Sequence, residues 1–246
     1  MDLGDDIELA RGIAAETGAL LLRLRADSGL TGTALGARGD RAADDLILAR
    51  LRAARPDDCI LSEESHDDRA RCAASRVWVI DPLDGTRDYA EGRDDWAVHI
   101  GLAVDGFPAA GVVGLPVLGR LHASDDPPLP RPPLPARPRM VVSRTRSAEV
   151  VTRVGAALGA ELVGMGSAGA KAMAVVDGRA EIYLHAGGQY QWDNCAPAAV
   201  ALAAGLHASR IDGTPLAYNG EDPLLPDLLI CRKELAGAVL AAITAA

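Results

Sequence analysis

The sequence predicts a layered fold of the α/β (α+β) class, and three observations predict it. Helical periodicity opens the chain, β-rich stretches separated by glycine turns fill its middle, and strand-like and helix-like segments alternate from residue 139 onward. With 246 residues, of which 49% are hydrophobic, the chain has room for one large domain or two smaller ones that share a cleft.

The first elements follow from apolar spacing. Residues 7–26 place Ile, Leu and Ala at helical intervals, which predicts an amphipathic helix. Asp40 is expected to cap a second helix, because an acidic residue precedes an apolar stripe there. Residues 59–65, "CILSEES", predict a short strand that leads into an acidic turn, and "RVWVID" at 76–81 predicts a buried strand.

The middle of the chain predicts an antiparallel meander that ends at a boundary. Three β-rich stretches lie between residues 96 and 123, and Gly106 and Gly119 supply the turns between them. The segment "DDPPLPRPPLPARPR" (125–139) has too many prolines for a sheet, so we interpret it as a linker. The predicted division is an N-terminal α+β part at 1–125, a linker at 126–138 and a C-terminal α/β part at 139–246.

The C-terminal part predicts an alternation of strands and helices, which indicates an α/β layer arrangement. The expected strands are 139–143, 161–165, 180–184 and 227–232. The expected helices are 148–158, 168–176, 194–204 and 234–244.

Composition and charge narrow the class of partner. The net charge of −9 is opposite to that of proteins that bind nucleic-acid polymers through their phosphates. We see no secretory signal and no apolar run long enough to span a bilayer, so no membrane partner is expected. Four scattered cysteines without a C-x-x-C pair favour a reducing cytoplasm over a disulfide framework or a zinc knuckle. They are Cys59, Cys72, Cys195 and Cys231.

Carboxylates gather where two predicted strands end. Asp81 and Asp84 follow a buried strand, and Glu63 and Glu64 end the strand before it. If the two strands end together, these charges repel each other unless cations lie among them, and hard divalent ions such as Mg²⁺ prefer oxygen ligands. No Cys or His accompanies the cluster in the sequence, which disfavours soft metals. The alternative is a solvated turn in which Asp84 caps a helix starting at Gly85.

The loop after Asp84 supplies the other half of a phosphate site. Gly85 and Thr86 open a predicted short helix, whose backbone N–H groups can bind a phosphate. Metal-holding carboxylates beside such amides are suited to hydrolysis of a phosphate ester, and the Thr86 hydroxyl is placed to orient an attacking water.

Four motifs resemble those of the inositol monophosphatase superfamily, in its order and approximate spacing. They are "LSEE" (61–64), "DPLDGT" (81–86), "GSAGAKA" (166–172) and "WD" (192–193). The resemblance implies a layered αβαβα sandwich of the inositol monophosphatase/fructose-1,6-bisphosphatase type and a Mg²⁺-dependent, lithium-sensitive phosphomonoesterase, with a homodimer as the suggested assembly. "VSRTR" (142–146) and "YLHAGGQYQWD" (183–193) look most like the CysQ-type group.

The finer resemblance implies a small phosphorylated substrate, 3′-phosphoadenosine 5′-phosphate, which is hydrolysed to AMP and phosphate in sulfate assimilation. Inositol monophosphate and fructose 1,6-bisphosphate are the alternatives. In inositol monophosphatases proper, a glutamate that contacts an inositol hydroxyl stands seven residues before the "WD" aspartate. Here that position is Ala186, which favours another substrate.

The resemblance also implies roles for individual residues. Two to three Mg²⁺ ions would be held by the carboxylates of Glu63, Asp81, Asp84 and Asp193 and by the backbone carbonyl of Leu83, with Asp40 near a third, looser ion. Glu63 with Thr86 would activate the attacking water. The substrate would meet Glu63, Leu83, Asp84, Gly85, Thr86 and Asp193, and its nucleotide part would meet Ser143, Arg144 and Lys171.

Simpler interpretations stand beside these roles. Asp193 is also suited to cap the following helix, Arg144 to lie on the surface, and Lys171 to extend from a helix into solvent. "GMGSAG" (164–169) matches the G-x-G-x-x-G pattern of dinucleotide sites, but the acidic residue expected after the next strand is missing, so close helix packing is the better explanation. A non-catalytic phosphate-sensing protein on the same fold is a third possibility, against which the full set of ligands argues.

Overall fold

The first part of the chain folds as two long helices followed by a sheet. The computed structural model describes residues 3–67, 69–145 and 148–245. Its elements up to the proline-rich segment are α1 (Gly4–Asp27), α2 (Gly32–Ala54), β1 (Cys59–Ser62), the 3₁₀ turn η1 (Ala70–Ala73), β2 (Arg76–Asp84), α3 (Thr86–Ala90), β3 (Ala97–Val104), β4 (Phe107–Leu115), the 3₁₀ turn η2 (Pro116–Leu118) and β5 (Arg120–Ala123).

Strands and helices alternate in the second part, as predicted. The elements are β6 (Arg139–Ser143), α4 (Glu149–Ala157), β7 (Glu161–Met165), α5 (Ala168–Val176), β8 (Ile182–Tyr190), α6 (Gln191–Ala203), β9 (His207–Ser209), β10 (Leu224–Cys231) and α7 (Lys233–Thr244). The short strand β9 has no counterpart in the sequence prediction, because three residues are too few to show a period.

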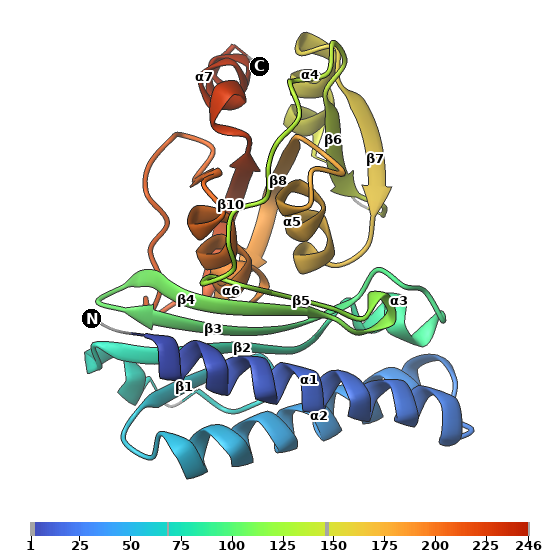
Figure 1. The fold of residues 1–246 in the computed structure, drawn as a ribbon, viewed down its shortest axis with the longest axis vertical. Helices are drawn as coiled ribbons and strands as arrows, with labels where there is room; N and C mark the ends of the chain where they lie inside the picture. Colours follow the sequence, from blue (N-terminus) through green and yellow to red (C-terminus); the bar gives the residue numbers. More distant parts are fainter. Residues whose placement is uncertain (1–2, 68, 146–147, 246) are drawn as a thin grey trace.

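The described elements form five layers, and the αβαβα prediction is confirmed (Figure 1). The first sheet has the order β1-β2-β3-β4-β5, and β3 to β5 form the predicted antiparallel meander. The second sheet has the order β7-β6-β8-β10-β9. Helices α1 and α2 cover the outer face of the first sheet, α5 and α6 lie between the sheets, and α4 and α7 cover the far face of the second (Figure 1).

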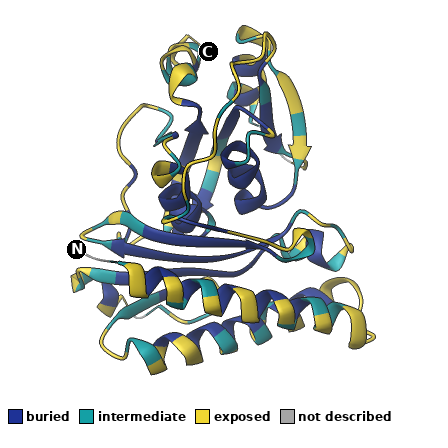
Figure 2. Ribbon diagram, in the orientation of Figure 1, coloured by how far each residue is buried: buried dark blue, intermediate teal, exposed yellow. Residues whose placement is uncertain are grey.

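Strand β2 is buried on both faces, which explains its unbroken apolar sequence. Val77 and Val79 belong to the core around α5 and α6, whereas Trp78 and Ile80 belong to the core under α1 and α2. Strands β2 and β3 and the middle helices α5 and α6 are accordingly mostly dark blue in Figure 2, whereas the edge strand β7 is largely exposed. Because side chains alternate along a strand, Asp81 projects from the same face as Val79, toward α6.

The expectation that Asp40 caps the second helix is wrong. Helix α2 begins at Gly32, and Asp40 lies inside it. The glycines before Asp40 suggest a helix boundary, but they serve close packing instead. A Cβ atom at Gly36 would lie 2.8 Å from the methyl carbon of Thr86, and one at Gly39 would lie 2.9 Å from a side-chain carbon of Leu83. The two glycines therefore let α2, and with it Asp40, pack closely against Leu83 and Thr86.

Helix α6 also begins earlier than predicted. It starts at Gln191, so Pro197 lies inside the helix and not in its first turn. Strand β8 runs on to Tyr190 through Gly187 and Gly188, which have positive φ values of 117° and 89°. Glycines with such backbone angles indicate a loop in a sequence, and the extension of β8 is visible only through its pairing with β10.

The proline-rich segment runs along the surface without regular structure between β5 and β6. Arg131 anchors it by donating to the carbonyl oxygens of Val175 and Ala204, and Arg232 donates to that of Pro132. The division at 126–138 stays a proposal, supported by the position of this segment between the two sheets. None of the helices in the described residues is both long and apolar enough for a membrane span.

Candidate functional site

The ends of β1 and β2 bring the first carboxylates together. The two strands are parallel, with Ser62 opposite Ile80, and the Glu63 N–H continues the ladder by donating to the Ile80 carbonyl at 3.2 Å. Glu63 therefore follows its strand at the level of Asp81, as the sequence predicts. Asp44 of α2 secures this turn, because its carboxylate accepts from the hydroxyls of Ser62 (2.6 Å) and Ser65 (2.8 Å).

Asp81 and Glu63 show the electrostatic cost of this arrangement. Asp81 is 1% exposed, and burial followed by the nearby charge of Glu63 raises its pKa well above the usual range. Desolvation of its carboxyl group, followed by the charge of Asp193, raises the pKa of Glu63 to about 7. The free carboxylates thus repel each other, as expected from the sequence.

Asp84 is held by one of its two oxygens. Its Oδ2 accepts hydrogen bonds from the Ser167 hydroxyl at 2.5 Å and from the Gly169 N–H at 2.7 Å, and the Nε2 of His99 lies 3.1 Å away. Burial alone would raise the pKa of Asp84, but His99, Lys171 and Ser167 outweigh it and lower the pKa. The alternative in which Asp84 caps the next helix is wrong, because Gly85 occupies the cap position and the carboxylate points to α5.

His99 is a residue of this cluster that the sequence did not reveal. It lies on β3 opposite Asp81 and is fully buried. Its Nδ1 lies 3.1 Å from the carbonyl oxygen of Trp192. The expectation that no histidine accompanies the acidic cluster is wrong, since ligand atoms of Asp81, Asp84 and His99 lie within 4.8 Å of one another. The only signal in the sequence is a polar residue inside an otherwise apolar strand.

The surroundings of His99 favour its charged form. Burial would lower the pKa of its ring, but the carboxylate of Asp84 outweighs burial and raises it. Both ring nitrogens face oxygen atoms, which suits an imidazolium with a proton on each nitrogen.

Asp193 reaches the cluster from the first turn of α6. It is the third residue of that helix and not its cap, and its Oδ2 accepts from the N–H of Tyr190 at 2.5 Å. One oxygen thus stabilises the start of the helix, and the carboxyl group also faces the other acids. Burial and the charge of Asp84 raise the pKa of Asp193 to about 6.

The loop at Gly85 and Thr86 lies against α2. Gly85 has a φ of +88°, which glycine adopts without strain, and it starts the short helix α3. The Thr86 Oγ1 lies 2.9 Å from Asp40 Oδ1 and 3.1 Å from the Leu83 carbonyl oxygen, so its hydroxyl proton has two acceptors. Burial raises the pKa of Asp40 to about 6.

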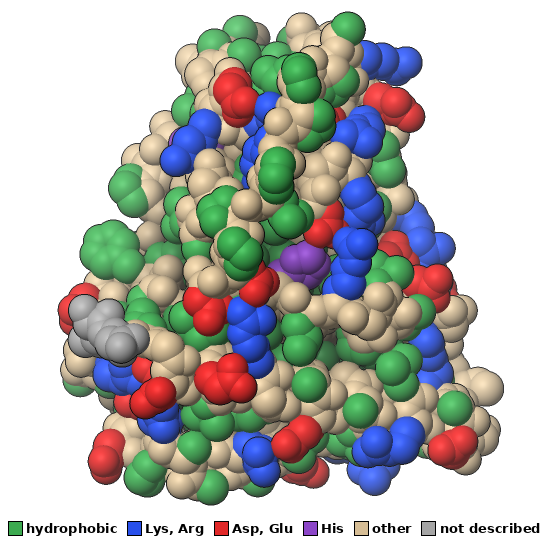
Figure 3. All heavy atoms as spheres, viewed as in Figure 1, with side chains coloured by type: hydrophobic (Ala, Val, Ile, Leu, Met, Phe, Trp, Pro, Cys, Tyr) green, Lys and Arg blue, Asp and Glu red, His purple; other side chains and the backbone are tan. Residues whose placement is uncertain are grey.

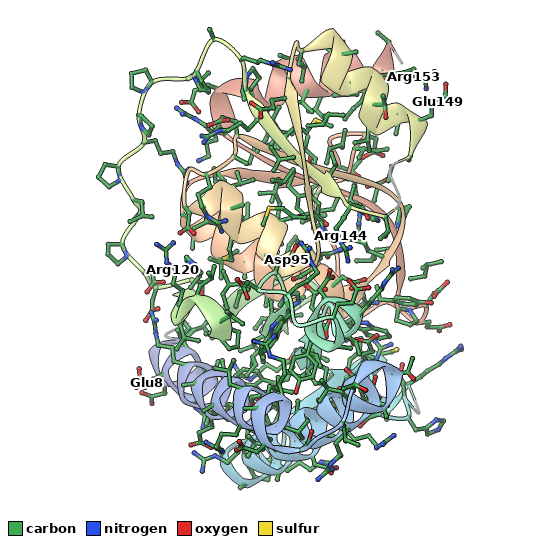
Figure 4. The ribbon with its side chains drawn as sticks, turned by 90° about the vertical axis from the view of Figure 1, so that its right-hand side faces the viewer. Glu8, Asp95, Arg120, Arg144, Glu149 and Arg153 are labelled. Atoms are coloured by element: carbon green, nitrogen blue, oxygen red, sulfur yellow. The ribbon has the colours of Figure 1, made fainter. Side chains whose placement is uncertain are left out.

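Polar contacts between the two parts of the chain lie next to this loop. Arg144 pairs with Asp88 of α3 at 2.7 Å and with Glu91 at 3.1 Å, and the Asp95 carboxylate accepts from the Gly166 N–H at 2.6 Å. Figure 4 places Arg144 and Asp95 at the junction between the two halves. On the face drawn in Figure 3, acidic and basic side chains are interspersed. Arg144 therefore joins the halves in this structure.

Lys171 does not extend into solvent. It is 5% exposed, and its Nζ donates to the carbonyl oxygens of Gly166 (2.7 Å) and Ser167 (2.6 Å). Burial lowers its pKa. The lysine thus stabilises the turn that presents Ser167 and Gly169 to Asp84. The glycine pattern around it provides close packing, since a Cβ at Gly166 would lie 2.4 Å from an Asp88 oxygen.

A cavity of about 330 Å³ opens beside this junction. It contains Ser143, one of the predicted nucleotide contacts, and Ala186, the position where a glutamate would stand in inositol monophosphatases. Thr145, Ala148, His185, Gly187 and Gly188 complete its lining. Arg146, the last residue of the "VSRTR" motif, lies outside the described residues.

The fold and the site together define a class of proteins in which acidic side chains meet at strand ends between the layers of an αβαβα sandwich. The chain belongs to the inositol monophosphatase family, whose model matches residues 6–128 and 133–245.

Among known proteins, the chain is 51% identical to the 3′-phosphoadenosine 5′-phosphate phosphatase of Mycobacterium bovis. The alignment spans 238 residues and covers 93% of this chain and 89% of that protein. It is 31% identical to the 3′(2′),5′-bisphosphate nucleotidase CysQ of Salmonella typhimurium, covering 76% of this chain and 80% of the relative. The crystal structure of CysQ from Bacteroides thetaiotaomicron superposes with a TM-score of 0.79 at 25% identity, covering 93% and 97% of the two chains.

Proposed function

We propose that this chain is a Mg²⁺-dependent phosphatase that hydrolyses the 3′-phosphate of 3′-phosphoadenosine 5′-phosphate, yielding AMP and phosphate. The observation that carries the proposal is the convergence of Glu63, Asp81, Asp84 and Asp193 at the strand ends, in a chain half identical to proteins named for that activity. The setting in sulfate assimilation stays a prediction, as does a cytoplasmic location.

The donor set fits magnesium. Four carboxyl groups and the Leu83 carbonyl offer oxygen atoms only. The raised pKa values of Asp81, Glu63 and Asp193 reflect burial and, after it, mutual repulsion, which a divalent cation would relieve. We propose that these groups hold two ions and that Asp40 lies near a third. When bound, Mg²⁺ would polarise the phosphate and lower the pKa of a bound water, which supplies a nucleophile at neutral pH.

The residues of the chain supply orientation and proton transfer. We assign Glu63 and Thr86 to the attacking water. The Thr86 hydroxyl lies 2.9 Å from Asp40, whose pKa of about 6 suits a base near neutral pH, so a proton taken up at Thr86 Oγ1 has an acceptor. The backbone N–H groups of Gly85 and Thr86 would bind the phosphate oxygens. The P–O3′ bond breaks as water attacks phosphorus, and the released 3′ oxygen takes a proton.

The cavity at Ala186 supports a nucleotide rather than a polyol. A glutamate there would offer a hydroxyl-binding carboxylate, whereas alanine and two glycines leave about 330 Å³ open beside Ser143. Cavities of this size fall within the range that small ligands occupy. We propose Ser143 and Arg144 as contacts to the nucleoside or its second phosphate. We propose Lys171 for the same purpose; its Nζ binds two carbonyl oxygens and lies 5.4 Å from the centre of the Tyr183 ring.

The test compares kcat/KM for three substrates in Mg²⁺, with and without Li⁺. We expect 3′-phosphoadenosine 5′-phosphate to exceed inositol 1-phosphate and fructose 1,6-bisphosphate by about tenfold or more, and Li⁺ to inhibit. Ala186→Glu should raise KM for the nucleotide, while Ala203→Glu, at an exposed position of α6, should leave it unchanged. A preference for inositol 1-phosphate, or nucleotide binding without turnover, would contradict the proposal.

The proposed assembly is a homodimer, which the family resemblance suggests. Light scattering coupled to size-exclusion chromatography measures it directly. A mass near the 25.5 kDa of one chain at micromolar concentration would contradict it.

A further inference from the structure

One oxygen of Asp84 is enclosed on three sides. Its Oδ2 receives the Ser167 hydroxyl and the Gly169 N–H from the start of α5, and His99 approaches from β3. Among the described residues, no hydrogen bond to Oδ1 is found. The groups around Oδ2 therefore fix which oxygen of Asp84 faces the other carboxylates.

His99 is the one member of this set that bridges three elements. Its ring stands on β3, its Nδ1 is set against the Trp192 carbonyl on α6, and its Nε2 lies 3.1 Å from Asp84 at the end of β2. The ring is fully buried. Because the carbonyl oxygen can only accept, Nδ1 carries a proton and the orientation of the ring is defined.

The backbone of α5 is shaped around this ring. A Cβ atom at Gly169 would lie 2.0 Å from His99 Nε2 and 3.0 Å from Cδ2, so no side chain fits there while the imidazole is in place. Because Nε2 lies against the α5 backbone and only 3.1 Å from Asp84 Oδ2, the packing favours an action of His99 on that carboxylate.

We propose that His99 is a positioning residue that orients Asp84 for metal binding, with Gly169 as its required packing partner. The inference rests on the proposed function, since Asp84 is there assigned to the metal. Removal of a group that orients a metal ligand typically lowers metal affinity by about 10- to 100-fold. Position 99 lies outside the four family motifs.

The experiment separates the two nitrogens of the ring. In His99→Gln the amide nitrogen reaches about as far as Nε2, so a nitrogen close to Asp84 Oδ2 is retained. In His99→Asn the amide reaches only as far as Nδ1, so the contact to Trp192 is retained and that to Asp84 is lost. Mn²⁺ binding to the substrate-free protein is measured by calorimetry or electron paramagnetic resonance, and thermal melting in EDTA verifies folding.

We expect His99→Asn to weaken Mn²⁺ binding by about tenfold or more and His99→Gln to bind within about threefold of wild type. Equal affinity of wild type and both variants would overturn the inference. So would equal losses in the two variants, which would indicate a merely structural role or direct ligation through the imidazole. If the wild-type protein takes up no Mn²⁺, it is the metal-dependent function that fails.

A double-mutant cycle provides a second, independent readout. Gly169→Ala in the wild-type background forces its methyl group against Nε2, so we expect a lower melting temperature in EDTA and weaker Mn²⁺ binding. In the His99→Asn background the space of Nε2 is vacant, and the same change should lower the melting temperature much less. Additive losses in the cycle would show that His99 and Gly169 do not act as a unit.

Discussion

Replacement of Asp84 by asparagine is the most direct perturbation of the site. The place of Oδ2 faces hydrogen-bond donors from Ser167 and Gly169, and His99 Nε2 lies 3.1 Å from it. The amide oxygen must take that place, because the amide nitrogen would meet donors there. The nitrogen then occupies the place of Oδ1, and an amide nitrogen offers no lone pair to a metal ion. Asp84→Asn therefore removes the proposed ligand without removing side-chain volume.

The expected magnitudes follow from these contacts. Transition-state stabilisation by a bound metal amounts to several kcal/mol, and each 1.36 kcal/mol is a factor of ten in rate. We expect kcat/KM to fall by about 10³-fold or more. Two hydrogen bonds to Oδ2 change from charged to neutral acceptors, at about 1 kcal/mol each. For a chain of this length, that loss lowers the melting temperature by about 4 to 8 °C.

Steady-state phosphate release and a thermal melt in EDTA measure the two effects separately. Asp212→Asn is the matched control, because Asp212 lies in an exposed turn where an amide oxygen can still accept from the Thr214 N–H. The control should resemble wild type in both assays. Near-wild-type activity of Asp84→Asn with unchanged Mn²⁺ affinity would refute the role of this carboxylate as a ligand.

Three further predictions concern the loop, the packing and the pH dependence. Thr86→Val should lower kcat by about 10²-fold or more, because it removes the hydroxyl that lies 2.9 Å from Asp40. Thr86→Ser keeps a hydroxyl and should retain most activity. Equal steady-state rates of the two variants would contradict this prediction. Gly166→Ala should lower the free energy of unfolding in urea by about 1 to 3 kcal/mol, because the new Cβ would lie 2.4 Å from a carboxylate oxygen of α3. Gly237→Ala should not lower it, because there is open space around Gly237. The raised pKa of Glu63, about 7, means that the folded metal-free protein holds a proton that the unfolded chain releases near pH 4. This contribution to stability is therefore lost as pH rises toward 7. Mg²⁺ should raise the melting temperature more at pH 8 than at pH 5, because at pH 5 the ion competes with protons for the carboxylates. A larger rise at pH 5 would contradict the acidic cluster as the binding site.

Much of the fold is legible in short windows of the sequence. The periodicity of residues 7–26, the glycine turns of the meander and the alternation after residue 139 each depend on neighbours a few positions apart. The same holds for the carboxylate pair of "DPLDGT", because a buried strand followed by two acids is visible locally. Glu63 could be placed beside Asp81 only because parallel strands end at a common edge, which the pairing of β1 with β2 confirms.

The remainder of the site depends on contacts between distant segments. His99 lies beside Asp84 because a register shift in β2 and β3 and the packing of α5 bring them together, and neither leaves a periodic signal in the chain. Asp40 lies inside a helix whose glycines resemble a boundary, since those glycines are selected by the distance to Thr86 and not by local propensity. Local preferences thus define the elements, whereas the orientation of each carboxylate is set by what packs against it once the layers have formed.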